Sequence, residues 1–277
     1  MSNELGQKSG WWYYRRMMRL AVLILAAAAS VRPALGADDP LARARQLYNE
    51  RNFAEAVQIA EQARLTPARA DAADLVSARA YLELYRESGA SDDLTNARDR
   101  LRRLDPQKFG PRDRAEYVVG LGETLFFDSA FGAAATVFDA VLQSRDALTA
   151  EARERVLDWW ATAVDREAKP RSEMERQGVY QRIRNRMDQE LATHPNSSVA
   201  VYWNAAAARS QGDHQAAWDA AQAGWVRARL ASDKGDALRA DLDRLVLRAI
   251  VPDRARATAQ PPDLLRAEWE RFKESWR

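Results

Sequence analysis

The chain has 277 residues, 47% of them hydrophobic and 30% charged, which is enough apolar material for one or two domains with a buried core. Helix breakers are rare, with 12 glycines and 10 prolines, and the abundance of Ala, Leu, Arg and Glu favours an all-α fold. The absence of cysteine excludes structural disulfides, thiolate chemistry and a lipid-modified N-terminal cysteine.

The net charge of +2 depends on the first part of the chain. Residues 1–36 contain five basic residues and one acidic residue, so 37 basic and 39 acidic residues remain after position 36 and the net charge there is near −2. A domain that binds nucleic acid would be basic, with clustered Lys and Arg. We therefore expect no nucleic-acid partner.

Residues 1–36 are expected to form a cleavable signal peptide. Three arginines precede an apolar run over residues 20–31, and Ala34-Leu35-Gly36 offers small residues at the positions that a signal peptidase reads. A helix of that length spans about 18 Å, less than the roughly 30 Å of a hydrocarbon core. We expect the mature protein to be periplasmic or secreted, without a permanent membrane anchor. An uncleaved signal anchor is the alternative, and Arg15-Arg16 leaves Sec and twin-arginine export both open.

Residues 41–67 and 74–106 each have the periodicity of two amphipathic helices joined by a turn. Asn52 can cap the second helix of the first hairpin, with Glu55 three residues later completing a capping box. Each hairpin ends at a proline, because the residue before a proline disfavours helical backbone angles. Two antiparallel helical hairpins are therefore expected before residue 107.

Residues 118–142 carry the most regular pattern. Gly122 and Ala134 supply the small side chains that close helix packing requires. Large apolar residues flank them: Leu121, Leu125, Phe131 and Phe138. The arrangement resembles the tetratricopeptide repeat (TPR), which has a Leu-Gly pair, an apolar residue three positions later, and Ala and Phe at fixed offsets. Two positions depart from the TPR pattern, because Val118 replaces its opening Trp and its closing Pro is absent.

The resemblance covers most of residues 40–230. Ala44 and Ala78 are 34 residues apart, the standard TPR period, whereas the later intervals are longer and require insertions in loops. A weaker fourth hairpin follows the central one, and residues 199–228 form a clear fifth. The resemblance implies an all-α, right-handed superhelical solenoid over residues 37–250, with about five hairpins and a closing helix.

Trp159 and Trp160, in the fourth hairpin, are adjacent and hence about 100° apart on a helix. We do not expect both to face one core. One should be buried and the other half-buried beneath the polar segment 167–178, unless the second Trp is a platform for a ligand.

The C-terminal part is expected to contain a linker over residues 251–262 and an amphipathic helix over residues 263–277. The apolar residues of this helix recur at helical spacing: Leu265, Trp269, Phe272 and Trp276. A solenoid must cover the apolar face of its last repeat, so we expect the helix to fold back as a cap. The alternative is a motif that docks into a groove of another protein.

In the TPR family the first helix of each hairpin lines a concave groove that takes extended peptides or partner helices. Transfer of those positions to this chain implies nine candidate residues: Arg45, Tyr48, Arg79, Leu82, Glu123, Phe126, Phe127, Tyr202 and Arg209. Phe126 and Phe127 follow a core residue and point in different directions, so either at least one is exposed in the groove or one packs on the neighbouring repeat.

Sequence patterns for catalysis are absent. Both histidines, His194 and His214, lie at expected helix ends, and there is no His-x-x-x-His, Gly-x-Ser-x-Gly or phosphate-binding glycine loop. We expect no catalytic residue, cofactor or metal, and hence no enzyme. The predicted function is a non-catalytic scaffold of the cell envelope that binds another protein. The alternative is a module that binds peptidoglycan or another glycan through Trp159, Trp160 and neighbouring aromatics.

Overall fold

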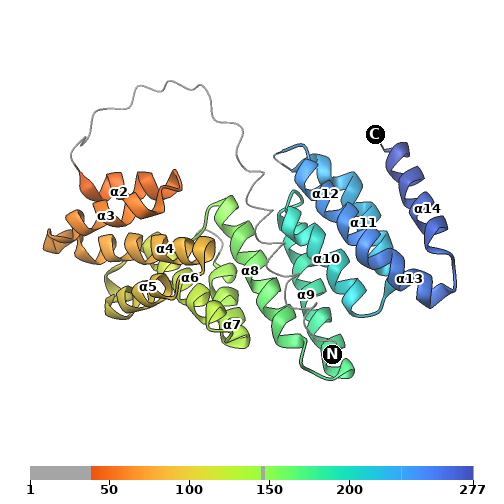
Figure 1. Cartoon of the computed structure of the whole chain (residues 1–277), viewed down its shortest axis with the longest axis horizontal. Coiled ribbons are helices and arrows are strands. Elements are labelled where there is room, and N and C mark those ends of the chain that lie inside the picture. Colours follow the sequence, from red (N-terminus) through yellow and green to blue (C-terminus); the bar gives the residue numbers. More distant parts are fainter. Residues whose placement is uncertain (1–38, 145–146, 232, 277) are drawn as a thin grey trace. The chain divides into compact units, whose positions relative to one another are not determined.

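The computed structural model describes residues 39–144, 147–231 and 233–276. All elements in these ranges are helical and none is a β-strand, which confirms the all-α prediction (Figure 1). The predicted signal peptide lies outside the described residues. The described chain divides into two compact units, which we call the N-terminal unit (up to Glu190, with residues 210–212) and the C-terminal unit (Leu191–Arg209 and from Asp213 onward).

The N-terminal unit is a series of helices in which neighbours along the chain contact each other. In order these are α2 (Pro40–Asn49), α3 (Phe53–Arg64), α4 (Ala70–Ser88), α5 (Ser91–Arg103), α6 (Pro111–Phe127), α7 (Phe131–Gln143), α8 (Ala150–Ala168) and α9 (Glu173–Thr193), the last of which ends just beyond the unit. Short 3₁₀ turns, Pro67–Arg69 and Pro106–Lys108, separate the first three hairpins at the predicted prolines.

Local sequence explains several helix ends. The Asp39 side chain accepts a hydrogen bond from the Leu41 amide at 3.0 Å and starts α2, and Thr149 accepts one from the Ala152 amide at 3.2 Å and starts α8. Gly89, with φ of 74°, ends α4 in the left-handed conformation that glycine adopts readily. The expected capping box at Asn52 is wrong, because Asn52 occupies the N-cap position of α3 without a side-chain bond to the helix.

The central hairpin, α6 and α7, packs as closely as its small residues predict. Ala134 and Phe138 are fully buried. A Cβ atom added to Gly122 would lie 2.8 Å from Phe138 Cδ1, closer than two carbon atoms approach without displacement. The Phe138 ring therefore occupies the space that any larger residue at position 122 would need.

Gly122→Ala is expected to destabilise the N-terminal unit. Displacement of a buried ring costs about 1–3 kcal/mol, which exceeds the gain of up to about 1 kcal/mol from the better helix propensity of alanine. Gly178→Ala is the matched control, because Gly178 also lies inside a helix but nothing within 4 Å would meet its Cβ. Urea unfolding should show a lower midpoint for Gly122→Ala and an unchanged or higher one for Gly178→Ala. Equal midpoints would contradict the packing argument.

The C-terminal unit contains the rest of α9, then α10 (Ser198–Ser210) up to Arg209, α11 (His214–Arg227), α12 (Asp236–Leu245), α13 (Val251–Thr258) and α14 (Pro262–Ser275). A π-helical turn, Val246–Ile250, joins α12 to α13 without a break. Gly224 allows close packing within this unit, because a Cβ there would lie 2.6 Å from Val201 Cγ1. One cluster of buried residues from α10 to α14 forms the core.

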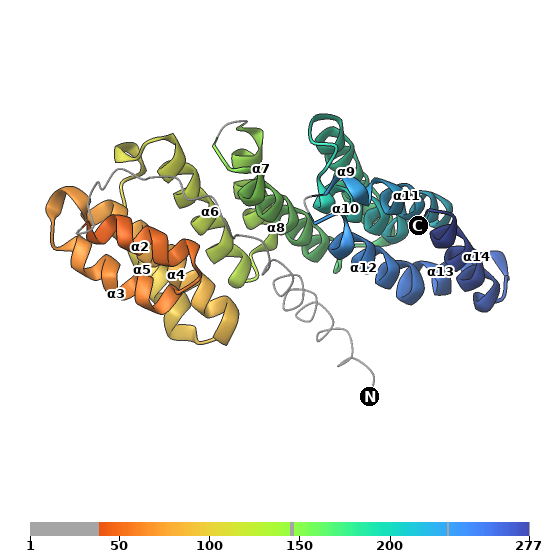
Figure 2. The same ribbon diagram turned by 90° about the horizontal axis from the view of Figure 1, so that it is seen from above.

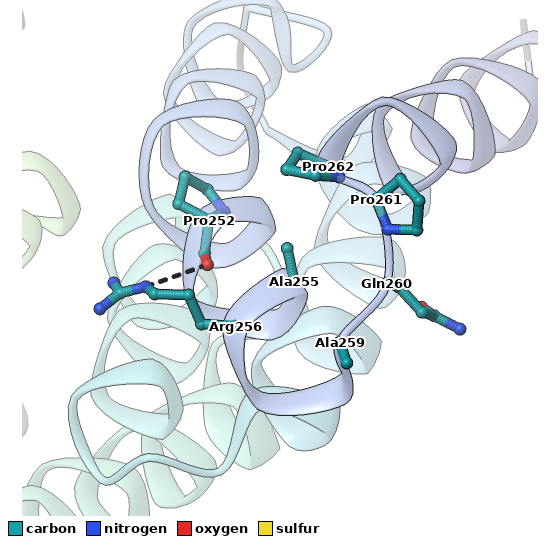
Figure 3. A pocket seen from close by; sticks show the side chains of 7 residues that line it. All are labelled: Pro252, Ala255, Arg256, Ala259, Gln260, Pro261 and Pro262. Atoms are coloured by element: carbon teal, nitrogen blue, oxygen red, sulfur yellow. Dashed lines mark hydrogen bonds between the residues drawn. The ribbon is translucent and has the colours of Figure 1, made fainter.

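The expectation of a linker over residues 251–262 is wrong for most of its length, because Val251–Thr258 forms α13. Pro252 suggested a helix break, since proline lacks an amide hydrogen and its ring crowds the carbonyl one turn earlier. The π-helical turn directly before it widens the helix at that point and accommodates the ring. Only residues 259–261 are non-helical, at the bend that Figure 3 shows between Ala259 and Pro262.

The C-terminal helix α14 packs back on its own unit, beside α13 (Figures 1 and 2). Leu265 and Trp269 are buried, and the Trp269 Nε1–H group donates a hydrogen bond to Asp243 at 2.8 Å. The Trp269 ring contacts Trp218 and Trp225 of α11, with centroids 5.9 and 5.5 Å away. This is the capping arrangement, in which α14 covers the apolar face of the preceding helices.

Candidate interaction face of the N-terminal unit

The first helices of successive hairpins in the N-terminal unit are neighbours. Helix α2 contacts α4, α4 contacts α6, and α6 contacts α8, in addition to the contacts of each helix with the next one along the chain. Side chains from different hairpins thus meet on one face. We call it the first-helix face and define it by Arg45, Tyr48, Arg79, Asp113, Glu116 and Glu123.

Three of the residues implied by the TPR resemblance are connected on this face. Arg79 donates a hydrogen bond to Glu116 at 2.8 Å, and its guanidinium lies 4.3 Å from the centroid of the Tyr48 ring. Arg45 of α2 forms an ion pair with Asp113 of α6 at 3.2 Å. The structure therefore places Arg45, Tyr48 and Arg79 on one face, where Arg45 pairs with Asp113 and Arg79 links Tyr48 to Glu116.

The carboxylates Asp113 and Glu116 were missed by the transfer of TPR positions, which follows the small residue of each helix. A helical pattern was nevertheless available, because Asp113, Glu116 and Glu123 lie at i, i+3 and i+10 and share one side of α6. The charges on this side match the arginines of α2 and α4. A search for carboxylates at helical spacing opposite arginines would have found them.

Charge dominates the pKa of Arg79. Burial disfavours its charged form, but Tyr48 and the carboxylates of Glu116 and Glu123 outweigh that effect and raise the pKa above its usual value. Arg79 therefore stays protonated and keeps α2, α4 and α6 linked through its side chain.

For Glu123, burial has a larger effect on the pKa than the nearby charges do. Burial raises the pKa of its carboxyl group, and the positive charges of Arg86, Arg79 and Arg155 only partly oppose this. The Glu123 carboxylate makes no hydrogen bond or ion pair with the residues that the structure describes. It is therefore a half-buried acidic group without a direct partner, lying between arginines of α4 and α8.

Leu82 does not belong to the first-helix face, although the resemblance implied it. It is 1% exposed and packs with Leu94 and Ala97 of α5. The transfer of TPR positions leaves one side of α4 exposed in the groove at Leu82, whereas α4 is covered by α3, α5 and α6. Leu82 is a core residue.

Phe126 and Phe127 are half-buried in an aromatic cluster that joins three hairpins. Phe127 lies edge-on to Tyr85 of α4 and Trp159 of α8, with centroids 4.8 and 5.5 Å away. Phe126 lies edge-on to Trp159 at 4.6 Å and to Phe131 at 5.2 Å. Both rings pack on neighbouring hairpins, so packing accounts for their position without a ligand.

Trp159 and Trp160 are both buried, at 4% and 1% exposure, so the expectation that one would be half-buried is wrong. Helix α8 is covered on both sides. Trp159 packs against the Phe126 and Phe127 rings, while the guanidinium groups of Arg182 and Arg186 from α9 lie 5.5 and 5.7 Å from the Trp160 ring. Neither Trp ring has an exposed face on which a glycan could stack.

Tyr202 and Arg209 lie on α10, in the C-terminal unit, and are not part of the first-helix face. Arg209 forms an ion pair with Asp253 of α13 at 2.7 Å. Tyr202 is half-buried and contacts the Trp203 ring edge-on. The ion pair links α10 to α13 within the C-terminal unit.

Within the described ranges, no group of three or more His, Asp and Glu side chains is placed to hold a metal ion. A shallow notch lies at the α13–α14 bend and is lined by Pro252, Ala255, Arg256, Ala259, Gln260, Pro261 and Pro262 (Figure 3). It contains no nucleophile and no carboxylate. None of the helices from Pro40 onward that the structure describes has the length and apolar character needed to cross a bilayer.

Comparison of the chain with known protein families, curated proteins and solved structures finds no match.

Proposed function

We propose that this chain is a TPR-like helical scaffold that binds a segment of a partner protein across the first-helix face. The observation that carries the proposal is the side-by-side packing of α2, α4, α6 and α8, which collects polar side chains from separate hairpins on one face. Repetition of this hairpin packing would build the right-handed solenoid that the TPR resemblance implies. Placement in the cell envelope rests on the signal-like pattern of residues 1–36.

Glu123 makes this face suited to binding rather than to stability alone. A carboxylate that is partly desolvated and lacks a hydrogen bond disfavours the folded state, and proteins keep such groups where function requires them. A donor from a partner, such as a backbone amide or a side-chain amide, would supply the missing hydrogen bond to Glu123. The arginines on either side would donate hydrogen bonds to carbonyl or carboxylate oxygens of the partner.

Glu123→Gln is expected to reduce partner binding without harming the fold. Loss of a hydrogen bond to a charged group is worth about 1.5–3 kcal/mol, so recovery of the partner should fall about tenfold or more. The measurement is affinity purification of the tagged chain after in-cell crosslinking, with quantification of each captured protein. Glu55→Gln is the control, because Glu55 is an exposed carboxylate on α3, away from the first-helix face.

Stability measurements separate this effect from misfolding. Because burial raises the folded-state pKa of Glu123 above its unfolded value, the wild type should lose stability as pH rises from the unfolded to the folded pKa. Glu123→Gln should lack that loss and be at least as stable as the wild type at neutral pH. If Glu123→Gln and Glu55→Gln recover the same partners in equal amounts, the first-helix face is not the binding site.

The glycan-binding alternative has lost the residues on which it depended, since Trp159 and Trp160 are buried. We therefore put forward protein binding alone.

A further inference from the structure

The bend between α13 and α14 holds a residue in an unfavourable conformation. Ala259 has φ of 54° and ψ of 25°, the left-handed region in which a Cβ atom crowds the following carbonyl. Helices commonly end in this way with glycine, which has no Cβ. When α14 packs on its own unit, which we call the closed form, the Ala259 backbone is strained. Glycine at this position would remove the strain.

The two residues after this position determine how the bend can open. Proline disfavours helical backbone angles at the residue before it, so Pro261 biases Gln260 and Pro262 biases Pro261 towards extended conformations, and Pro261 has ψ of 130°. One helix that continues α13 into α14 is disfavoured, because two consecutive prolines remove two amide donors. The favoured relaxed form is an extended arm, which at roughly 3.1 Å per residue would carry α14 away from its own unit. Residues 256–264 are all exposed, so the contacts that oppose this movement are those of α14 itself, from Leu265 onward.

The surface that α14 covers is specific as well as apolar. Trp269 is fully buried against Trp218 and Trp225, and Phe272 stacks on Trp269 with centroids 5.7 Å apart. Asp243 accepts hydrogen bonds from both Trp269 Nε1 and Lys273 Nζ, the latter at 2.7 Å. A helix that fills this surface must present an indole and an ammonium group four residues apart. The α14 helix of a second copy meets that requirement.

We propose that α14 is exchanged between two copies of this chain, so that each copy's α14 covers the Trp218 and Trp225 surface of the other. The contacts of α14 would be the same in the monomer and in the dimer, and the exchange would be reciprocal about a two-fold axis. Relief of the strain at Ala259 favours the open, exchanged form, while loss of translational freedom on association opposes it. Dimer formation should therefore be weak and dependent on concentration.

The test measures association between labelled copies of the full-length chain in a non-ionic detergent. The chain has no cysteine, so Ser275→Cys, at an exposed position near the end of α14, allows one label per copy. Donor-labelled and acceptor-labelled copies are mixed and energy transfer is followed against concentration. We expect transfer to rise with concentration in the parent chain.

Ala259→Gly is the decisive variant, because it removes the backbone strain of the closed form and leaves the contacts of α14 unchanged. The strain of one left-handed alanine corresponds to a roughly tenfold change in the equilibrium between the closed and open forms of one copy. Because a dimer contains two bends, the variant should raise the dissociation constant by roughly 100-fold. Gln260→Ala, at the neighbouring exposed position, is the control and should leave the dissociation constant unchanged. A chain that shows no concentration-dependent transfer, or one whose transfer is the same with Ala259→Gly, would overturn the proposal.

Discussion

Trp269→Ala is expected to destabilise the C-terminal unit by about 3–5 kcal/mol. The side chain is fully buried, contacts the rings of Trp218, Trp225 and Phe272, and donates a hydrogen bond to Asp243. Its removal leaves a cavity between α11 and α14 and leaves the Asp243 carboxylate with one donor fewer. Helix α14 should detach before the rest of the unit unfolds, because Leu265 is its only other buried residue.

Trp276→Ala on the same helix is the matched control. Trp276 is 46% exposed, so its truncation should change the free energy of unfolding by well under 1 kcal/mol. Hydrogen exchange of the α14 amides, together with urea unfolding, measures both effects. If exchange in α14 is equally slow in Trp269→Ala and in the wild type, the helix is held by contacts other than those of the indole.

Glu190→Ala should destabilise the N-terminal unit by a similar amount, about 3–5 kcal/mol, because it leaves a partly buried guanidinium without its partner. Arg153 of α8 donates two hydrogen bonds to the Glu190 carboxylate of α9, at 2.6 and 2.8 Å, and Glu190 is 2% exposed. The hydrogen bond from Arg153 to Glu190 is the largest contribution to the raised pKa of Arg153. The substitution removes that contribution, but a guanidinium stays protonated in proteins, so Arg153 cannot avoid the cost by losing a proton.

A double variant tests whether this loss comes from the unpaired charge. In Arg153→Met with Glu190→Leu both charges are gone, and replacement of a buried ion pair by apolar residues is often neutral. We expect the double variant to be more stable than Glu190→Ala in urea unfolding, with a residual loss from the bond that Arg153 Nη1 donates to the Leu142 carbonyl. If the double variant is as unstable as Glu190→Ala, lost packing rather than an unpaired charge is responsible.

Only some residues of the first-helix face could be predicted from the sequence. Arg45, Tyr48 and Arg79 come from the TPR resemblance, whose groove positions transfer to α2 and α4 because helical periodicity keeps them on one side of each helix. Their partners Asp113 and Glu116 could not be chosen in that way. Asp113 is 68 residues from Arg45, and the pairing exists only because α2, α4 and α6 lie side by side.

The errors have the same origin. Leu82, Trp159 and Trp160 were judged from one helix at a time, whereas burial depends on how many neighbours cover that helix, and α4 and α8 are covered on more than one side. Pro252 was judged from its local effect on a regular α-helix. The π-helical turn that accommodates it is a property of the packed α12–α13 helix.

The sequence by itself determined the helical class, the positions of the hairpins and the need for a small residue at Gly122, since these depend on propensity and on spacing within one or two turns. Only the tertiary structure decided which side chains share a face, that the Glu123 carboxylate is left without a direct partner, and that α14 covers Trp218 and Trp225. These features depend on contacts between residues far apart in the chain. Many different sequences satisfy the same helical period, and the period does not specify which helices meet.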